Sequence, residues 1–255
     1  MILKEKNGIS FFQFPNLAEF SGIQHGIFTR KGGNSSKPFS SLNVTLGLGD
    51  SEAAVRQNRS EISQAMGGKE LVFASQVHGT KVLVLSNNNN SGWNSGTKKP
   101  GDAIVTNIPM KPLVIQVADC QAVLMYDPVR QVIANVHSGW RGSINNIIGA
   151  AADVMIKKFD CNPSDIVAGI GPSLGPCCAE FVNYEKEIPE KFWKYKNSSD
   201  HFDFWWVSKD QLCNAGVLAE NIYSGNMCTK CNTDLFFSYR GEGVTGRFAV
   251  VAGLT

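Results

Sequence analysis

Apolar residues gather in short runs along the chain, a pattern more typical of strands than of long helices. The most continuous runs lie between Leu113 and Gly142, where the turn Asp127-Pro128 separates two stretches rich in Val, Ile and Leu. We expect two neighbouring buried strands there. The opening of the chain, with its F-F-Q-F-P, reads as an edge strand, and residues 71–85 read as two short strands around the turn H-G-T. Further strand-like runs occupy residues 23–29, 44–48, 101–106, 166–170 and 248–254.

Helical spacing of apolar residues appears in fewer places. Ser51 precedes an acidic turn and an amphipathic segment that stops at Gly67-Gly68, which predicts a capped helix over 51–66. Apolar residues recur every three or four positions from Ile144 to Phe159, so we predict one long helix from near Arg141 to Asn162-Pro163. Residues 184–195 and 209–219 also read as helices.

Two stretches lack any such periodicity. Residues 31–41 are rich in Gly, Asn, Ser and Pro, a composition typical of loops that close over ligands. Residues 87–100 form a low-complexity segment that predicts a surface loop. Neither is a linker between domains, and no charge block divides the chain, so residues 1–255 are expected to form a single domain.

Composition narrows the class of protein. A hydrophobic share of 43% indicates a globular chain, and a formal net charge of +2 argues against nucleic acid as a partner. No apolar run approaches the roughly 20 residues of a membrane span, and the first residues lack the plan of a signal peptide. We therefore expect no membrane partner and a cytoplasmic location, with seven cysteines that are mostly reduced. Nothing here indicates an oligomeric state.

Candidate chemistry lies where the apolar runs end. Cys120 follows Ala118-Asp119, His137 precedes Ser138-Gly139, and His78 closes the run Q-V-H. A cysteine and a histidine support either a thiolate nucleophile with an imidazole base or a shared metal ion. If all three converge, two imidazoles and one thiolate leave a fourth position open, as in catalytic zinc sites. Taken alone, hydrogen-bonded histidines and a buried thiol are the more frequent situation.

The segment H-S-G-W-R-G predicts a second feature. A strand that feeds a helix leaves backbone N–H groups without partners at the helix start, and a nearby arginine helps them to hold an anion. Arg141 is placed for this role. By contrast, Cys228-Thr229-Lys230-Cys231 reads as a lone C-x-x-C of structural character rather than a metal site, and Cys177-Cys178 as packing beside the site.

Several motifs in a fixed order resemble the YfiH-type laccase-domain family over nearly the whole chain. They are T-R-x-G-G at Thr29, S-L-N at Ser41, Q-V-H-G at Gln76, G-D-A-x-V-T at Gly101, A-D-C at Ala118, D-P at Asp127, H-S-G-W-R-G at His137, G-P-S-L-G-P at Gly171 and S-Y-R-G-E-G-V-T-G-R at Ser238. The resemblance implies an α+β fold, a single layered domain of mixed β-sheets with helices on the outer faces. It also implies zinc held by His78, Cys120 and His137.

The sequence departs from the family pattern at three positions. Gly241 replaces a usual second arginine, Ser138 replaces an alanine, and Gln121 stands where proline is frequent after A-D-C. None of them is an expected ligand. Gln121 bears on the fine geometry beside the thiolate rather than on the class of reaction.

The activity implied by the resemblance is zinc-dependent purine nucleoside phosphorolysis of adenosine, inosine and related nucleosides, with adenosine deaminase activity beside it. Its partners are then a purine nucleoside and phosphate. Arg30, Arg141 and Arg240 are candidates to hold the phosphate, and Asn43 to orient the substrate. Without the motifs, each arginine would be read as a surface or ion-paired residue.

Three alternatives stay open at this point. A polyphenol oxidase would use a mononuclear copper site, with Met125 as a conceivable axial ligand, because only His25 and His201 remain for a larger copper cluster. A Cys-His amide hydrolase that edits peptidoglycan precursors would use Cys120 as nucleophile and His137 as base. A non-catalytic metal-binding module would hold the metal in a closed site.

Overall fold

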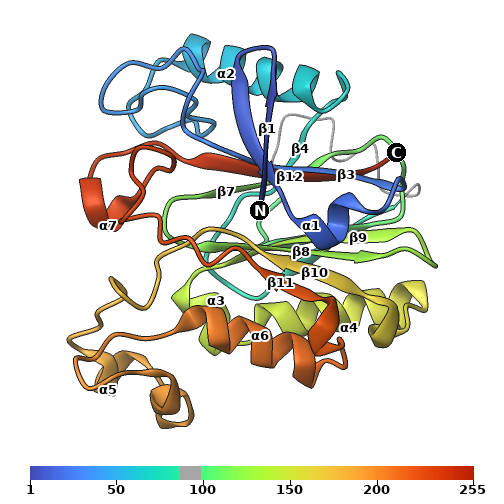
Figure 1. The fold of residues 1–255 in the computed structure, drawn as a ribbon, viewed down its shortest axis with the longest axis vertical. Helices are drawn as coiled ribbons and strands as arrows, with labels where there is room; N and C mark the ends of the chain where they lie inside the picture. Colours follow the sequence, from blue (N-terminus) through green and yellow to red (C-terminus); the bar gives the residue numbers. More distant parts are fainter. Residues whose placement is uncertain (87–98) are drawn as a thin grey trace.

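Two six-stranded mixed sheets lie face to face, and helices cover their outer sides (Figure 1). The structure, a computed structural model, describes residues 1–86 and 99–255. The loop predicted at 87–100 therefore falls almost wholly outside the described residues. Within the described ranges, no helix is long and apolar enough to cross a membrane.

The first sheet is built around the last strand of the chain. Its order is β1 (Ile2–Lys6), β2 (Ile9–Gln13), β3 (Ile23–Phe28), β12 (Phe248–Leu254), β7 (Leu113–Val117) and β4 (Val72–Phe73). Val250 of β12 lies opposite Ile27 on one side and Ile115 on the other. All neighbours are antiparallel except β4 and β7. The edge strands are β1 and β4, so the opening of the chain does supply an edge strand, but the F-F-Q segment lies on β2, one strand further in.

The second sheet carries the two longest internal strands at its centre. Its order is β11 (Ile222–Ser224), β10 (Val167–Ile170), β8 (Gln121–Asp127), β9 (Val132–Ser138), β6 (Ala103–Thr106) and β5 (Val82–Leu85). β8 and β9 form an antiparallel hairpin in which Ala122 lies opposite His137. The outer pairs, β10 with β11 and β5 with β6, are parallel.

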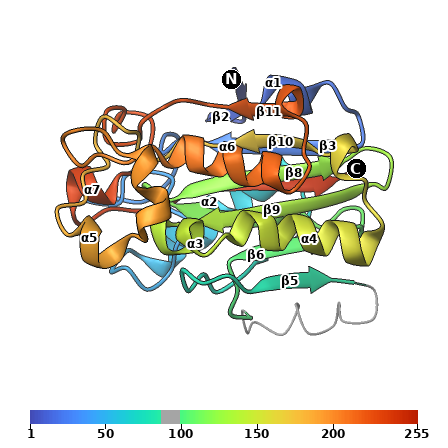
Figure 2. The same ribbon diagram turned by 90° about the horizontal axis from the view of Figure 1, so that it is seen from below.

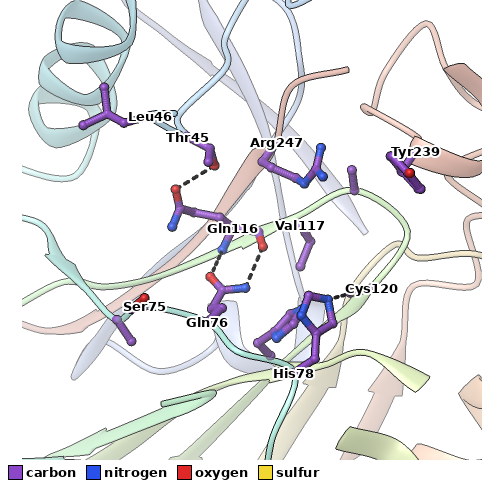
Figure 3. A pocket seen from close by; sticks show the side chains of 13 residues that line it. Thr45, Leu46, Ser75, Gln76, His78, Gln116, Val117, Cys120, Tyr239 and Arg247 are labelled. Atoms are coloured by element: carbon purple, nitrogen blue, oxygen red, sulfur yellow. Dashed lines mark hydrogen bonds between the residues drawn. The ribbon is translucent and has the colours of Figure 1, made fainter. Parts of the chain in front are cut away.

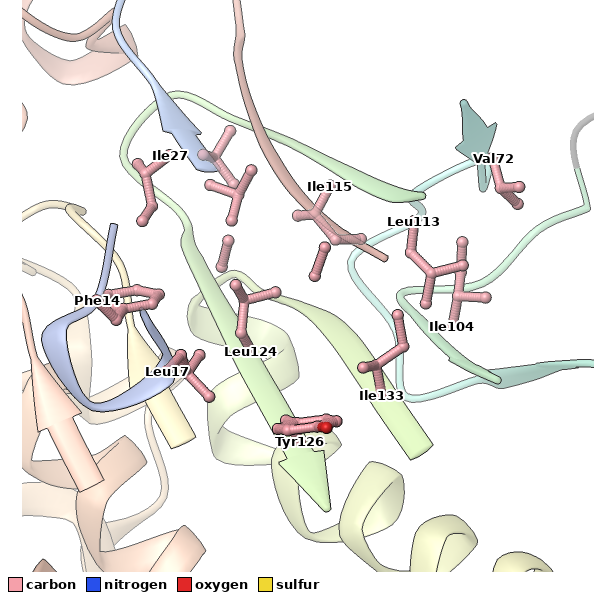
Figure 4. Packing of buried hydrophobic residues seen from close by; sticks show 14 of the residues in the cluster. Phe14, Leu17, Ile27, Val72, Ile104, Leu113, Ile115, Leu124, Tyr126 and Ile133 are labelled. Atoms are coloured by element: carbon pink, nitrogen blue, oxygen red, sulfur yellow. The ribbon is translucent and has the colours of Figure 1, made fainter. Parts of the chain in front are cut away.

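Side chains of β8 fill cores on both faces of the second sheet. Leu124 and Tyr126 pack between the two sheets (Figure 4), whereas Val123 and Met125 pack toward the helices. A strand buried on both faces reads as a continuous apolar run, which is why the stretch was conspicuous in the sequence. Each such side chain contributes about 1.5 to 3 kcal/mol by leaving water, so this hairpin is a rigid base for the residues at its ends.

Helix α2 (Glu52–Ala65) covers the first sheet, and α3 (Trp140–Ile144), α4 (Ile147–Phe159) and α6 (Phe204–Asn214) lie on the side of the second (Figures 1 and 2). The remaining helical pieces are α1 (Pro15–Ala18), α5 (Tyr184–Glu187), α7 (Tyr239–Glu242) and the 3-10 turns η2 (Pro163–Asp165), η3 (Glu190–Tyr195) and η4 (Ala219–Asn221). The predicted α+β class with mixed sheets and outer helices is confirmed.

The stretch at 113–142 differs from the prediction in one important respect. It holds three strands, and the chain crosses from the first sheet to the second between β7 and β8. Asp119 makes the crossing with φ 81°, in the left-handed region that few residues other than glycine adopt. The crossing brings Cys120 to the place where the two sheets meet.

Other boundaries also differ. The helix predicted from Arg141 is broken because Asn146 takes a left-handed φ of 61° and caps α4 by accepting a hydrogen bond from the N–H of Gly149. Residues 44–48 form no strand, and 184–195 form only α5 and a 3-10 turn. The helix predicted at 209–219 starts earlier, at Phe204, where the Asp203 side chain caps it.

Candidate metal centre and its two pockets

His78, Cys120 and His137 converge. Their ligand atoms all lie within 4.8 Å of one another, and Sγ of Cys120 is 3.8 Å from Nε2 of His78. His78 comes from the connection between β4 and β5, Cys120 directly precedes β8, and His137 lies near the end of β9. The two imidazole rings stand nearly perpendicular, at 84°. Residues brought together from three segments in this way form a site rather than three separate core positions.

The buried carboxylate of Asp102 holds both histidines. One oxygen accepts hydrogen bonds from Nδ1 of His137 at 2.9 Å and from the backbone N–H groups of Val77 and His78. The other accepts from the N–H of Gly79 at 2.8 Å. These bonds fix a turn in which His78 takes a φ of 59°. One carboxylate therefore sets the orientation of one ring and the backbone position of the other.

Charges in the cluster favour a thiolate. Burial raises the pKa of Cys120, but hydrogen bonds with His137 and His78 outweigh it and lower the pKa to about 6. Burial lowers the pKa of His137, yet Asp102 and Cys120 together raise it to about 9. The pKa of Asp102 is lowered despite burial, through His137 and the N–H groups of the turn. Cys120 is thus ready to bind a cation at neutral pH.

Gly139 makes the close approach possible. A Cβ at this position would lie 2.8 Å from Cδ2 of His78 and 3.1 Å from Sγ of Cys120, and both are tighter than ordinary contacts. Any larger residue at 139 would displace a candidate ligand. This explains in physical terms the glycine of the segment H-S-G-W.

The donor set fits a metal ion. Because Nδ1 of His137 is engaged by Asp102, its Nε2 is left to bind, in the carboxylate–histidine arrangement common at zinc. Tetrahedral bonds of 2.0 to 2.3 Å place ligand atoms about 3.3 to 3.8 Å apart, and the pair His78 and Cys120 already has this separation. Two imidazoles and one thiolate leave a fourth side open toward the pockets.

A pocket of about 500 Å³ lies on one side of the cluster (Figure 3). Gln76 and Gln116 line it and are locked together, since the Gln76 amide binds the backbone N–H and C=O of Gln116. The hydroxyl of Thr45 donates a hydrogen bond to the side-chain oxygen of Gln116 at 2.7 Å. The NH₂ group of Gln116 therefore stays available to donate hydrogen bonds to a ligand. Arg247 completes the wall. This pocket offers amides and a hydroxyl for neutral polar groups.

A second pocket of about 330 Å³ lies on the other side and shares His78 and Cys120 with the first. Its walls combine aromatic rings with two guanidinium groups, from Trp140, Arg141, Phe181, Phe204, Tyr239 and Arg240. Both arginines are exposed to solvent at the mouth of the pocket, where two cations close together attract an anion.

Arg141 lies where the sequence placed it, but the reason differs. Its guanidinium stacks 4.2 Å from the Trp140 ring and makes no hydrogen bond or ion pair within residues 1–86 and 99–255. Helix α3, in which Arg141 is the second residue, has only five residues. The anion site predicted at the start of a long helix therefore rests on the guanidinium of Arg141 alone. Arg240 is held more firmly, because its backbone N–H binds Asp119 and its side chain binds the carbonyl of Glu180.

Two other predicted substrate residues lie outside both pockets. Arg30 is paired with Glu242 at 2.8 Å and also donates to the carbonyls of Ser40 and Thr233, so its cation is already neutralised. Asn43 is fully buried. Its oxygen accepts from the backbone N–H of Arg247 at 2.9 Å, so it supports the pocket wall and does not contact a ligand. Neither residue lines the two pockets, and their predicted roles in binding substrate stay predictions.

Several functional candidates were missed in the sequence. The sequence pattern places Asp102 only at the start of a strand and gives Arg247, within T-G-R, no role. Each of these two polar residues directly precedes a fully buried strand. Gln76 belongs to the motif Q-V-H-G that supplied His78. A polar residue at the start of a buried strand was the available signal in both cases.

The remaining histidines take no part in the site. The chain has four in all. His25 is buried and accepts the backbone N–H of Phe14, while His201 is held by the carbonyl of Ser199. Met125 packs in the core beside the helices, so it is not an axial ligand as conceived from the sequence. The chain therefore lacks the imidazoles that a multicopper cluster needs.

The C-x-x-C pair is not alone, contrary to the prediction. The structure brings Cys228 and Cys231 beside Cys177 and Cys178, with the four sulfur atoms within 4.8 Å of one another. The pairs are far apart in sequence, which is why neither spacing revealed the cluster.

The chain matches a known protein family over most of its length. Residues 24–255 match the family model described as multi-copper polyphenol oxidoreductase laccase. The chain belongs to this family. The family description mentions several coppers, whereas the histidines of this chain provide for a single centre of two imidazoles and one thiolate.

Individual relatives cover nearly the whole chain. A purine nucleoside phosphorylase of Haemophilus influenzae is 31% identical, over 93% of this chain and 96% of its own length. The purine nucleoside phosphorylase YfiH of Escherichia coli is 30% identical, over 92% and 95%. The crystal structure of YlmD from Geobacillus stearothermophilus superposes with a TM-score of 0.87 at 30% identity, covering 98% of this chain and 97% of that one.

Proposed function

We propose that this family member is a purine nucleoside phosphorylase that cleaves adenosine, inosine and related nucleosides with phosphate and also deaminates adenosine. The observation that carries the proposal is the position of His78, Cys120 and His137 between two pockets of different chemistry. Such an arrangement suits two substrates that must meet at one centre. The names of the relatives in Haemophilus and Escherichia support the same reaction.

The two pockets differ in charge, because one arginine, Arg247, lines the larger pocket and two, Arg141 and Arg240, line the smaller one. The larger one, with Gln76, Gln116 and Thr45, offers amides and a hydroxyl that suit the neutral polar edges of a nucleoside. The smaller one holds Arg240 and Arg141, whose guanidinium has no anionic partner in the part of the chain that the structure describes. Phosphate carries about two negative charges, and guanidinium groups bind it through paired hydrogen bonds. We assign phosphate to the smaller pocket.

His78, Cys120 and His137 are the residues that would hold the metal, and zinc is the ion that we expect, because a mixed imidazole and thiolate set suits it. Copper accepts the same donors. A zinc ion in an open three-ligand site supplies Lewis acidity and lowers the pKa of water. Asp102 keeps His137 in one orientation and so keeps the site formed in the absence of substrate.

Residues of the chain then position the reaction. Arg141 and Arg240 hold hydrogen phosphate so that one of its oxygens bonds to the anomeric carbon of the ribose as the bond from that carbon to the purine nitrogen breaks. The products are ribose 1-phosphate and the free purine, which takes up the proton that the phosphate loses. Gln116 fixes the nucleoside through its free NH₂ group. Trp140 and Phe181 exclude water from the anion, which strengthens the electrostatic contacts. In deamination, water adds instead to C6 of the adenine ring and ammonia leaves, so the arginines that hold phosphate are not required.

One incubation tests this proposal. Metal-quantified protein is mixed with adenosine, with and without phosphate, and the products are separated. Adenine that appears only with phosphate supports phosphorolysis, and inosine supports deamination. Neither product from fully metallated protein would contradict the proposal. An otherwise identical reaction with Cys120→Ala protein controls for contaminating enzymes.

A second candidate function rests on a specific contact chain. Asp102 accepts a hydrogen bond from His137, and His137 in turn stabilises the thiolate of Cys120. In a cysteine hydrolase, Cys120 would be the nucleophile, His137 the base, and Asp102 the acid that orients the base. Such an enzyme would cleave amides of the kind found in peptidoglycan precursors. It needs no metal, so full amide hydrolysis after chelation would favour it over the phosphorylase. Oxidation of phenols by copper-loaded protein would favour the oxidase instead.

A further inference from the structure

A second group of metal-type donors lies apart from the site described above. Cys177 and Cys178 belong to the turn that follows β10, and Cys228 and Cys231 to the turn that follows β11. Because β10 and β11 are parallel neighbours, both turns leave the same edge of the second sheet. The four residues contribute four of the seven cysteines in the chain.

The spacing of the sulfur atoms fits one tetrahedral ion. Sγ of Cys231 lies 3.6 Å from Sγ of Cys177 and 3.6 Å from Sγ of Cys178, and all four sulfurs are within 4.8 Å. Zinc–sulfur bonds of about 2.3 Å place the sulfurs of a tetrahedral site about 3.8 Å apart. A disulfide needs a separation near 2.05 Å, and no two of these sulfurs are joined.

We propose that Cys177, Cys178, Cys228 and Cys231 form a tetrathiolate zinc site that joins the two turns. Four thiolates complete the coordination of zinc and leave no position for water or substrate, so the site is structural. Tetrahedral sulfur ligation suits zinc or iron, and a colourless, redox-inactive zinc ion is our assignment.

The backbone around the cysteines is arranged for a bound ion. Sγ of Cys228 accepts hydrogen bonds from the N–H groups of Gly175 and Cys231, the kind of support that zinc thiolates receive from neighbouring backbone. The two turns are also joined directly, since Ser173 binds the backbone of Met227 and Thr229. These hydrogen bonds already hold the two turns side by side, so binding of a metal ion requires little further ordering of the chain.

The site adjoins the smaller pocket through Asp119. That carboxylate accepts hydrogen bonds from the hydroxyls of Thr229 and Ser238 and from the backbone N–H of Arg240. Arg240 also donates to the carbonyl of Cys178. A zinc ion that holds the two turns therefore stabilises one wall of the pocket that we assign to phosphate. The zinc site itself stands whether or not that assignment is right.

Counting zinc in variants tests the site separately from the active centre. We expect two zinc ions per chain in reduced, zinc-reconstituted wild type, one in Cys120→Ala, and one in the double variant Cys228→Ser/Cys231→Ser. Combining all three changes should leave none. Cys213→Ser, at an exposed cysteine outside both clusters, is the matched control and should keep two.

X-ray absorption at the zinc edge tests the geometry without altering any of the four ligands. The Cys120→Ala protein should show four sulfur neighbours at about 2.3 Å and no nitrogen or oxygen in the first shell. No zinc in this folded variant, a shell that contains nitrogen or oxygen, or iron in place of zinc would each overturn the proposal. So would unchanged zinc content in the Cys228→Ser/Cys231→Ser variant. Phosphorolysis is not among these readouts, so failure of the proposed activity would leave the result interpretable.

Discussion

The two donor clusters differ in what surrounds them. His78, Cys120 and His137 meet where two sheets join, beside two pockets, and a buried carboxylate orients them. The four cysteines sit on turns at a sheet edge, with two of them exposed and no pocket in common with the first cluster. Three ligands with an open side allow a substrate to approach the ion, whereas four thiolates close the shell.

We infer that the number of ligands and the groups around them, and not the presence of a cysteine as such, separate the proposed reactive centre from the proposed structural one. Cys120 belongs to the reactive centre because imidazoles and a cavity surround it, and Cys228 to the other because thiols and backbone surround it. Each of the following experiments either breaks this contrast or makes it quantitative.

The largest effect is expected from Cys120→Ala. Loss of the thiolate removes one of three ligands, and metal catalysis worth several kcal/mol corresponds to a fall of roughly 10³-fold in the rate of phosphorolysis. Zinc in the four-cysteine cluster should remain. Steady-state rates and zinc content, measured on the same sample, check both statements, with Cys213→Ser as the control. Retention of most of the activity would mean that Cys120 is not a ligand.

The carboxylate behind the centre is the next target. Asp102→Asn keeps the size of the side chain but removes the charge that orients His137, and changes of this kind typically weaken metal affinity about 10- to 100-fold. Competition with a chromogenic chelator measures the affinity. Asp127→Asn is the matched control, because Asp127 is equally buried and accepts backbone N–H groups but touches no ligand. Equal losses in both variants would reduce Asp102 to a folding role.

A buried imidazole outside both clusters should behave in the opposite way to His137. Burial lowers the pKa of His25 to about 4, and its one hydrogen bond, from the N–H of Phe14, needs the neutral ring. The unfolded chain binds this proton near pH 6.5, so the stabilisation is complete above that pH and is lost as the pH falls toward 4.

We expect wild type to lose about 2 kcal/mol more stability than His25→Gln between pH 7 and pH 5, because only the histidine titrates. Urea unfolding at both pH values measures the difference. A difference that stays constant with pH would show that the ring takes up its proton equally readily in the folded and the unfolded protein.

The smallest effect tests the open side of the centre. Arg141→Ala removes a charge-assisted contact of order 1.5 kcal/mol, which predicts about a tenfold fall in phosphorolysis relative to deamination. The ratio of adenine to inosine over a phosphate titration reports it. Arg56→Ala, at an exposed arginine on α2, is the control. If Arg247→Ala changes that ratio and Arg141→Ala does not, phosphate occupies the larger pocket.

Local pattern was enough to predict much of the fold. The strands at 103–106, 166–170 and 248–254, together with the capped helix at 51–66, follow from runs and caps that act within a few residues. The sheet crossing at Asp119 was missed, since apolar residues continue on both sides of it. The break at Asn146 was missed because a single left-handed residue leaves the apolar spacing unchanged.

The site was predictable only in part, for a related reason. The ends of the apolar runs indicated His78, Cys120 and His137 as candidates. Their convergence depends on how the two sheets pack, which the sequence does not show. Arg30 is predicted to bind phosphate, and the sequence does not reveal its ion pair with Glu242, more than 200 positions away. The four-cysteine cluster was invisible for the same reason, because it depends on the pairing of β10 with β11.

The central position of β12 has a consequence for synthesis. The ribosome makes this strand after all the others, yet it separates β3 from β7 in the first sheet. Until residues 248–254 emerge, the two halves of that sheet have unpaired edges facing each other, and such edges favour aggregation. The β8–β9 hairpin can form much earlier, because its contacts are local. A nascent chain would thus hold Cys120 and His137 near each other, as a half-built metal site, well before its first sheet can close.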